Sequence, residues 1–326
     1  MTRLMNYEIL EQPPLRILIT EPIAVAGIEQ LRKVAMVDQR FELRPADLVS
    51  AIPPYNALIV RGATRVKAEV INAGQRLRVI GRAGSGVDNI DVVAATACNI
   101  AVVNAPDANT IAVAELTISL ILALARNVPQ AAASLASGAW MRGAFMGTEL
   151  HGKTLGLIGL GRIGSAVAVR AQAFGLVVLA HDPWVTPQHA AELGVKAVPL
   201  KELLSQSDYV SLHVPLNTAT RGLLSGPQLK HLKPGARLIN TARGELIDEA
   251  DLLMLLDSGE CAGAALDVFT REPPHGNPLL GHPRVLATPH LGAATIEAQE
   301  RASLEVVARV LAILQSSRPR SMRADA

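Results

Sequence analysis

The chain has 326 residues, of which 49% are apolar and 18% are charged, and its formal net charge is +2. This length is sufficient for two domains of ordinary size, and this composition excludes an intrinsically disordered chain. The small net charge argues against a nucleic-acid partner, because no basic run precedes the short tail at residues 318–323. Two cysteines, Cys98 and Cys261, argue against a disulfide scaffold and favour a reducing compartment. The longest apolar stretch, residues 111–125, is too short to span a bilayer, so we expect a cytoplasmic protein without a membrane partner.

Short β-rich runs alternate with helical stretches in the first third of the chain. This alternation predicts parallel strands that are covered by helices. The expected strands cover residues 16–20, 57–60, 77–80 and 101–103.

A long helix is predicted next, over residues 111–126. Apolar residues lie on nearly every face of this helix, which predicts burial between domains or against another subunit. The loop that follows is also unusually apolar, at Trp140, Phe145 and Met146. This favours a homodimer contact through this part of the chain.

A buried strand, a glycine turn and the start of a second helix follow. Gly159 permits the tight turn, Gly161 lets the backbone approach a pyrophosphate, and Gly164 lets helix and strand pack closely. The first N–H groups of the helix, at Arg162 and Ile163, then face the phosphates. The same spacing occurs in turns that bind no ligand, but the strand before it and the helix after it favour a dinucleotide site.

A further strand, predicted over residues 176–182, ends in Asp182. The Asp182 carboxylate would accept hydrogen bonds from ribose hydroxyls and would repel a 2′-phosphate. The residues that follow, Pro183, Trp184 and Val185, include no arginine to receive such a phosphate. The sequence therefore favours NAD over NADP.

The alternation of strands and helices continues to the end of the chain. The expected strands cover residues 209–214, 237–240, 264–268 and 284–288. Residues 296–315 predict one more amphipathic helix, which we expect to return to the first part of the chain.

The predicted fold class is α/β, with two parallel-sheet domains of Rossmann-like or flavodoxin-like type and an active-site cleft between them. The return of the last helix makes the substrate-binding domain discontinuous, with residues 1–107 and 296–326. The NAD-binding domain is predicted over residues 108–295.

Three polar side chains follow predicted strands of the second domain: Arg243, Glu272 and His290. Because ligands bind at the carboxyl ends of parallel strands, we expect all three on one rim. Arginine can grip a carboxylate with two parallel hydrogen bonds, and histidine can carry the proton that accompanies hydride transfer, with a glutamate to raise its pKa. The three together predict hydride transfer on a 2-hydroxy acid. Singly, each has an ordinary explanation: a surface ion pair for Arg243, a solvated turn residue for Glu272 and a satisfied loop histidine for His290.

In the first domain, the glycine-rich loop at residues 81–90 also follows a predicted strand. Successive backbone N–H groups in such a loop can bind a carboxylate, although an ordinary turn explains the glycines equally well. Arg61 follows the strand at residues 57–60 and adds positive charge at a similar strand end. The histidines show no spacing that suggests a metal site, so no metal is expected.

Together these motifs resemble the D-isomer-specific 2-hydroxyacid dehydrogenases over nearly the whole chain. The matching segments are residues 60–64, 81–91, 140–150, the GLGRIG turn, and residues 240–244, 261–273 and 289–293. The resemblance implies that Arg243 clamps the substrate carboxylate and that Glu272 orients His290, the general acid and base. Besides the glycine turn, the cofactor-binding residues that it implies are Asp182, Pro183, His213, Thr241, Ala242, Asp267 and Gly292.

Within that family, the chain is most similar to members that oxidise 3-phosphoglycerate at its 2-hydroxyl in serine biosynthesis. These enzymes place arginines around the substrate phosphate, and the resemblance implies Arg61, Arg82 and Arg142 for this role, the last from a partner subunit. Where close relatives carry further basic residues, this chain has Gly143 and Ala144. The other implied substrate-binding residues are Ser85, Gly86 and Asn109.

Other functions stay open. A hydroxypyruvate or glyoxylate reductase would use the same chemistry without the phosphate arginines. An NAD-sensing binding protein similar to transcriptional corepressors can keep the three polar side chains, although no extra segment for a partner surface is visible. A formate dehydrogenase would carry a glutamine in place of Glu272. Because the chain ends near residue 326, we expect no C-terminal regulatory domain.

Overall fold

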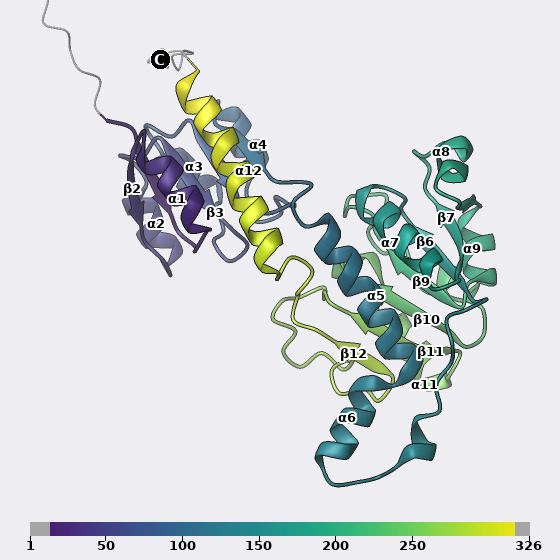
Figure 1. Cartoon of the computed structure of the whole chain (residues 1–326). Coiled ribbons are helices and arrows are strands. Elements are labelled where there is room, and N and C mark those ends of the chain that lie inside the picture. Colours follow the sequence, from purple (N-terminus) through teal and green to yellow (C-terminus); the bar gives the residue numbers. More distant parts are fainter. Residues whose placement is uncertain (1–13, 317–326) are drawn as a thin grey trace, which may run out of the picture. The chain divides into compact units, whose positions relative to one another are not determined.

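The computed structural model describes residues 14–316, so the basic tail at residues 318–323 lies outside the described residues. Backbone contacts divide the chain into two compact units. Unit 1 comprises Met1–Asn109 and Ile296–Ala326, and unit 2 comprises Thr110–Thr295. Figure 1 shows that the purple elements, which begin after residue 13, and the yellow helix, which ends at Gln315, lie side by side in unit 1.

Unit 1 contains a five-stranded parallel sheet in the order β2-β1-β3-β4-β5. Its strands are β1 (Arg16–Ile19), β2 (Met36–Gln39), β3 (Ala57–Val60), β4 (Val79–Arg82) and β5 (Ala101–Asn104). Its helices are α1 (Val25–Arg32), α2 (Pro45–Ala51), α3 (Ala68–Ala73), α4 (Val92–Ala97) and α12 (Ile296–Gln315). This strand order is the flavodoxin-like one, and it confirms the predicted α/β class.

The last helix, α12, packs on β4 although the two are far apart in the sequence. Val306 and Val310 are fully buried and lie directly against Gly81 in β4, which has no side chain to keep them away. Arg78, just before β4, donates a hydrogen bond of 2.9 Å to the carbonyl of Leu314. The helix therefore completes the hydrophobic core of unit 1.

Unit 2 contains a seven-stranded parallel sheet in the order β12-β11-β10-β9-β6-β7-β8. Its strands are β6 (Thr154–Ile158), β7 (Val177–His181), β8 (Lys196–Ala197), β9 (Tyr209–Leu212), β10 (Ala236–Asn240), β11 (Cys261–Leu266) and β12 (Val285–Ala287). Its α-helices are α5 (Thr110–Arg126), α6 (Val128–Ala136), α7 (Arg162–Ala173), α8 (Pro187–Glu192), α9 (Leu200–Gln206), α10 (Gly226–Leu229) and α11 (Glu249–Ser258), and its 3-10 turns are η1 (Arg142–Phe145) and η2 (Gly244–Leu246). The order reverses between β6 and β9, which is the switch point of a Rossmann sheet.

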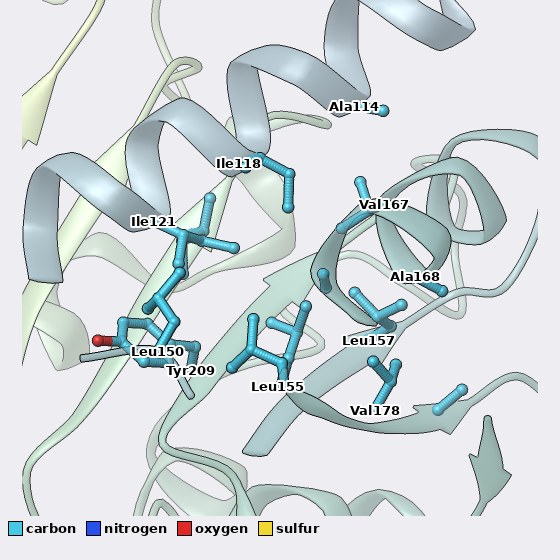
Figure 2. Close-up of a cluster of buried hydrophobic side chains, with 14 of the residues drawn as sticks. Ala114, Ile118, Ile121, Leu150, Leu155, Leu157, Val167, Ala168, Val178 and Tyr209 are labelled. Atoms are coloured by element: carbon cyan, nitrogen blue, oxygen red, sulfur yellow. The ribbon is translucent and has the colours of Figure 1, made fainter. Parts of the chain in front are cut away.

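The long helix α5 covers the unit 2 sheet with one apolar face. Figure 2 shows Ile118 and Ile121 of α5 in one cluster of buried side chains with Leu155 and Leu157 of β6. The predicted burial of this helix is confirmed on that face, whereas Glu115 on another face is exposed. Among the described residues no single helix is long and apolar enough to cross a membrane. The bent pair α5 and α6 reaches the length and apolar composition of a membrane span only when the two helices are taken together.

The sequence missed two short edge strands, β2 and β8. Both are largely exposed, so neither needs the apolar run by which a strand is recognised in a sequence. The predicted start of β4 at residue 77 was also wrong. The N–H of Leu77 instead bonds to the carbonyl of Gly74 in a turn (3.0 Å), and the strand begins at Val79.

Replacement of Gly81 by alanine is expected to lower the free energy of unfolding by about 1–3 kcal/mol, the usual cost of overpacking a core. The new Cβ would lie 2.7 Å from Val306 Cγ1 and 2.8 Å from Val310 Cγ2. Chemical denaturation measures the change, and Val306→Ala in the same chain should recover part of the loss. Gly143→Ala is the control, because nothing lies within 4 Å of its Cβ position. Equal denaturation midpoints for the two single variants would contradict this packing.

Candidate active site

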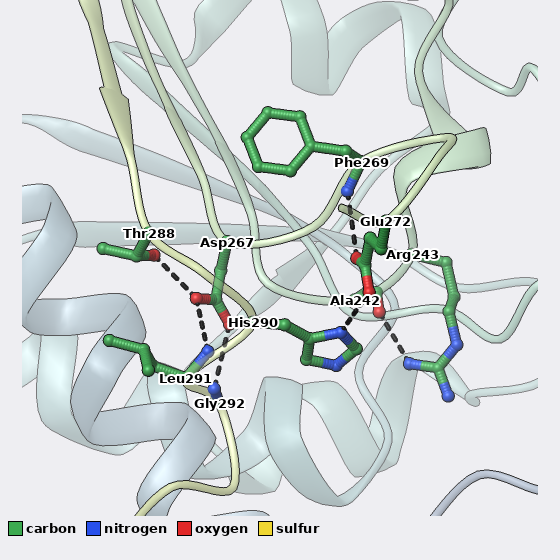
Figure 3. Close-up of polar contacts among 9 residues, drawn as sticks. All are labelled: Ala242, Arg243, Asp267, Phe269, Glu272, Thr288, His290, Leu291 and Gly292. Carbon is green, nitrogen blue, oxygen red and sulfur yellow. Dashed lines mark hydrogen bonds and ion pairs between the residues drawn. The ribbon is translucent and has the colours of Figure 1, made fainter. Parts of the chain in front are cut away.

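The carboxyl ends of β10, β11 and β12 lie side by side in unit 2, because the three strands are parallel neighbours. Arg243 follows β10, Glu272 follows β11 and His290 follows β12. The loops that leave these strands bring Glu272 and His290 into direct contact, as Figure 3 shows.

Glu272 and His290 form a hydrogen-bonded pair. Nδ1 of His290 lies 2.8 Å from Oε2 of Glu272, and both side chains are partly exposed. The backbone N–H of Phe269 donates to Oε1 of Glu272 at 3.2 Å, which orients the carboxylate. Because Nδ1 is directed at the carboxylate, Nε2 is the ring nitrogen that can exchange a proton with a ligand.

Each member of this pair shifts the pKa of the other. The hydrogen bond to Glu272 raises the pKa of His290 above its ordinary value; burial opposes the rise, the charges of Glu272 and Asp267 add to it, and the charge of Arg243 reduces it. Burial acts to raise the pKa of Glu272, but the hydrogen bond and charge of His290, with smaller effects of Phe269 and Arg243, hold it below its ordinary value. The pair therefore favours an imidazolium beside a carboxylate.

Asp267 holds the turn that carries His290. Its buried carboxylate accepts hydrogen bonds from the Thr288 hydroxyl at 2.6 Å and from the N–H groups of Leu291 at 2.7 Å and Gly292 at 2.9 Å (Figure 3). Its own carbonyl accepts from the His290 N–H at 2.9 Å. These bonds stabilise His290 in a left-handed backbone conformation, with φ of 54°, that non-glycine residues rarely adopt.

The loop that carries Glu272 contacts two residues for which the sequence suggested no such role. Glu249 accepts hydrogen bonds from the Thr270 N–H at 2.8 Å and from Nδ2 of Asn277 at 2.7 Å. Gly244 lies so close to the same loop that a Cβ there would be 2.0 Å from the carbonyl carbon of Phe269. Gly244 belongs to the matching segment at residues 240–244, but no local signal marks Glu249, because its partners lie more than 20 positions away in the sequence.

Arg243 extends from the loop after β10. Asn240 holds this loop by accepting from the Ala242 N–H at 3.0 Å and donating to the Arg243 carbonyl at 2.8 Å. The Arg243 guanidinium donates to the Ala242 carbonyl at 2.7 Å (Figure 3). In the same loop, the Thr241 hydroxyl lies 3.0 Å from the buried hydroxyl of Thr117 in α5.

The predicted glycine turn lies between β6 and α7. Gly159 has φ of 97°, and a Cβ there would be 2.5 Å from the His213 carbonyl oxygen, so no other residue fits. Gly161 precedes α7 without any side-chain cap, and nothing lies within 4 Å of its Cβ position. The first N–H groups of a helix have no partners within it, and here they include those of Ile163 and Gly164. This open, uncapped turn fits a pyrophosphate.

Asp182 lies at the carboxyl end of β7, followed by Pro183. Its carboxylate accepts from the N–H groups of Leu160 at 2.8 Å and Trp184 at 2.9 Å, which ties it to the glycine turn. A carboxylate has further lone pairs that can accept from ribose hydroxyls, so this end of the sheet fits the adenosine part of NAD. Beside the turn, burial lowers the pKa of His213 to about 4, so that this side chain is neutral.

The substrate-binding residues that the sequence named in unit 1 lie at or beyond its strand ends. Arg61 follows β3, Arg82 ends β4, Ser85 and Gly86 follow β4, and Asn109 ends the first segment of the unit. Asn104 of β5 donates from Nδ2 to the Ser85 carbonyl. Arg142 belongs to unit 2, where it begins η1 and is exposed. Within residues 14–316, no three His, Cys, Asp or Glu side chains gather in a way that could hold a metal ion.

Residues 118–292 match the family model of the D-isomer specific 2-hydroxyacid dehydrogenase, NAD binding domain. Over 270 residues the chain is 48% identical to a D-3-phosphoglycerate dehydrogenase of Pongo abelii, an alignment that covers 83% of this chain and 51% of the relative. The chain thus spans about half the length of that curated relative.

Solved structures are similar over nearly the whole chain. The TT0316 protein of Thermus thermophilus is 39% identical with a TM-score of 0.85, covering 92% of this chain and 97% of that one. A glyoxylate reductase of Paecilomyes thermophila is 32% identical with a TM-score of 0.85, covering 94% of this chain and 97% of that one. These matches show that the chain belongs to the D-isomer specific 2-hydroxyacid dehydrogenase family, with the NAD binding domain of that family at residues 118–292.

Proposed function

We propose that this protein is an NAD-dependent dehydrogenase that oxidises D-3-phosphoglycerate at its 2-hydroxyl to 3-phosphohydroxypyruvate, the first step of serine biosynthesis. The observation that carries the proposal is the contact of 2.8 Å between Glu272 and His290 within the NAD binding domain. The choice of substrate is supported by the relative of 48% identity that is named for this acid.

The cofactor site lies along the carboxyl edge of the unit 2 sheet. The glycine turn binds the pyrophosphate, Asp182 and Pro183 lie at the adenosine ribose, and His213 lies beside the turn. Thr241, Ala242, Asp267 and Gly292 line the nicotinamide end. When bound there, NAD supplies the acceptor for the hydride that leaves carbon 2 of the substrate.

His290 moves the proton that accompanies this oxidation. In its neutral form, Nδ1 donates to Glu272 and the lone pair of Nε2 faces the substrate hydroxyl, whose proton it takes. The Glu272 carboxylate then stabilises the imidazolium that results. In the reverse direction, the same Nε2–H donates a proton to the carbonyl oxygen.

Arginines and backbone N–H groups bind the two anionic ends of the substrate. Arg243 grips the carboxylate with its planar guanidinium, a geometry that lysine cannot reproduce. Ser85 and Gly86 donate from their backbone N–H groups to the carboxylate. Arg61, Arg82 and the partner subunit's Arg142 bind the phosphate. Asn109 is a further substrate-binding residue.

A second candidate is a hydroxypyruvate or glyoxylate reductase, which is favoured by the 32% identity to the glyoxylate reductase of Paecilomyes thermophila. Such an enzyme uses the same Glu272 and His290 chemistry on an acid without a phosphate. The paired side chains argue only weakly against a protein that senses NAD, because such a protein can keep them. We further propose a cytoplasmic location, in agreement with the free thiols of Cys98 and Cys261.

With NAD, wild-type enzyme is expected to oxidise 3-phosphoglycerate, and with NADH to reduce 3-phosphohydroxypyruvate in preference to hydroxypyruvate or glyoxylate. Arg61→Gln should lower kcat/KM for the phosphorylated acids by roughly tenfold to a hundredfold, since a hydrogen bond between charged groups contributes about 1.5–3 kcal/mol. NADH absorbance measures both. Equal or better use of the unphosphorylated acids by the wild type would favour the reductase instead.

Glu272→Gln is expected to lower the pKa of His290, because it removes the hydrogen bond to a carboxylate, and the charge of that carboxylate, which both raise this pKa. The reduction, which needs protonated His290, should then lose rate at a lower pH. The oxidation, which needs neutral His290, should begin to rise in rate at a lower pH than in the wild type. Rates in both directions from acid to alkaline pH measure the two shifts, and His290→Asn, which should lose roughly 10²–10⁴-fold in kcat at every pH, is the reference. If the pH profiles of Glu272→Gln equal those of the wild type, the contact with Glu272 is not what raises the pKa of His290.

A homodimer is proposed through the NAD binding domain, because Trp140 and Met146 near η1 are 82% and 84% exposed and Leu135 of α6 is 58% exposed. Light scattering should give twice the 34.4 kDa of one chain. Leu135→Glu should shift the mass toward that of one chain, whereas the exposed Val93→Glu in unit 1 should not. A single-chain mass for the wild type would refute this assembly.

A further inference from the structure

The loop that carries Arg61 is held by one carboxylate, that of Glu21 at the carboxyl end of β1. Oε1 of Glu21 accepts from the N–H groups of Arg61 at 2.9 Å and Thr64 at 2.8 Å. Oε2 accepts from the N–H of Ala63 at 3.0 Å. Three of the four N–H groups between residues 61 and 64 are therefore bonded to one side chain from a neighbouring strand.

This position requires a carboxylate and not merely a polar side chain. Both oxygens of Glu21 accept hydrogen bonds, so an amide would turn its NH₂ group toward at least one backbone N–H. Burial acts to raise the pKa of Glu21, but the N–H groups of Thr64, Ala63 and Arg61 hold it below its ordinary value. Glu21 is therefore charged at neutral pH.

Asn89 holds the carbonyl groups of the same loop. Its Nδ2 donates to the carbonyl oxygens of Arg61 at 2.9 Å and Thr64 at 2.7 Å. Asn89 itself belongs to the glycine-rich loop after β4 that includes Ser85, so its side chain ties the two loops together. The Arg61 backbone is thus bonded on its donor side by Glu21 and on its acceptor side by Asn89.

The charge of Glu21 has the wrong sign for a direct role in binding a phosphate. A negative charge bonded to the backbone of Arg61 repels an anion, so its removal by itself would strengthen anion binding. Only its effect on loop geometry would favour such a ligand. The two effects change the affinity for a phosphate in opposite directions, which makes them separable by experiment.

We propose that Glu21 and Asn89 are positioning residues that fix the Arg61 loop for recognition of the substrate phosphate, an inference that rests on the proposed function. Neither residue contacts the reacting atoms. Each acts through the backbone of residues 61–64, and together they set how strongly the enzyme prefers a phosphorylated over an unphosphorylated 2-hydroxy acid.

Glu21→Gln is expected to raise KM for 3-phosphoglycerate about tenfold, which corresponds to about 1.4 kcal/mol. The KM values for NAD and for hydroxypyruvate, which has no phosphate, should change less than about twofold, which corresponds to a smaller free energy than the tenfold change for 3-phosphoglycerate. Glu21→Asp, which keeps two acceptor oxygens on a shorter side chain, should lie between. Asn89→Asp, which sets a carboxylate against two carbonyl oxygens, should raise the same KM. Steady-state rates with each substrate provide these values.

Asp38→Asn is the matched control. Its carboxylate lies in the same unit and accepts from the side chains of Arg16 at 2.6 Å and Tyr55 at 2.8 Å, without contact to the Arg61 loop. It should lower the denaturation midpoint but leave the KM for 3-phosphoglycerate unchanged. The inference is wrong if Glu21→Gln leaves the KM for 3-phosphoglycerate unchanged or lowers it, or if it raises the KM for hydroxypyruvate equally. Either result would leave the proposed function intact. A wild-type enzyme without preference for the phosphorylated acid would overturn the proposed function as well.

Discussion

The contact between Glu272 and His290 depends on three separate loops that meet at one edge of the unit 2 sheet. Asp267 fixes the turn that carries His290 through bonds to two N–H groups and one hydroxyl. Glu249 fixes the loop that carries Glu272, and Gly244 lets the third loop lie against it without a side chain between them. Since each loop leaves a different parallel strand, the geometry of the pair is a property of the sheet edge and not of the two side chains alone.

The same physical device recurs along both sheets. Asp182, Asp267 and Glu21 each lie at or beyond the carboxyl end of a strand and accept at least two hydrogen bonds from backbone N–H groups. For Asp267 and Glu21 these groups belong to a neighbouring loop, whereas Asp182 accepts one bond from the glycine turn and one from its own loop. Bonds to a charged acceptor are stronger than bonds between neutral groups, so one side chain can orient a whole turn. In a chain of which only 18% is charged, several acids therefore shape the loops.

Local patterns predicted the parts of the fold that local patterns determine. The glycine turn and the helix Ile296–Gln315 were expected where they occur, because glycine spacing and helical periodicity are properties of adjacent residues. The same holds for the strand ends that carry Glu272 and His290, which the structure brings within 2.8 Å. Their chemical roles stay proposals.

The parts that were not predicted depend on contacts between distant residues. Edge strands β2 and β8 are defined by their neighbours in the sheet and not by an apolar pattern of their own. Glu249 and Glu21 bond to backbone groups as far as 21 and 43 positions away, so no pattern of adjacent residues reveals these contacts. These contacts could not be predicted because the residues that make them are far apart in the sequence, and not because the interactions are weak.

The charges around His290 are arranged in opposition. Glu272 and Asp267 raise the pKa of His290, and Arg243 lowers it. In the function that we propose, the substrate carboxylate binds Arg243 and offsets its positive charge, which reduces the opposition of that charge to protonation of His290. By this proposal, substrate binding would increase the basicity of Nε2, the atom that takes the proton of the hydroxyl. In this proposal Arg243 has two effects: it orients the acid, and it links the binding of the acid to the basicity of His290.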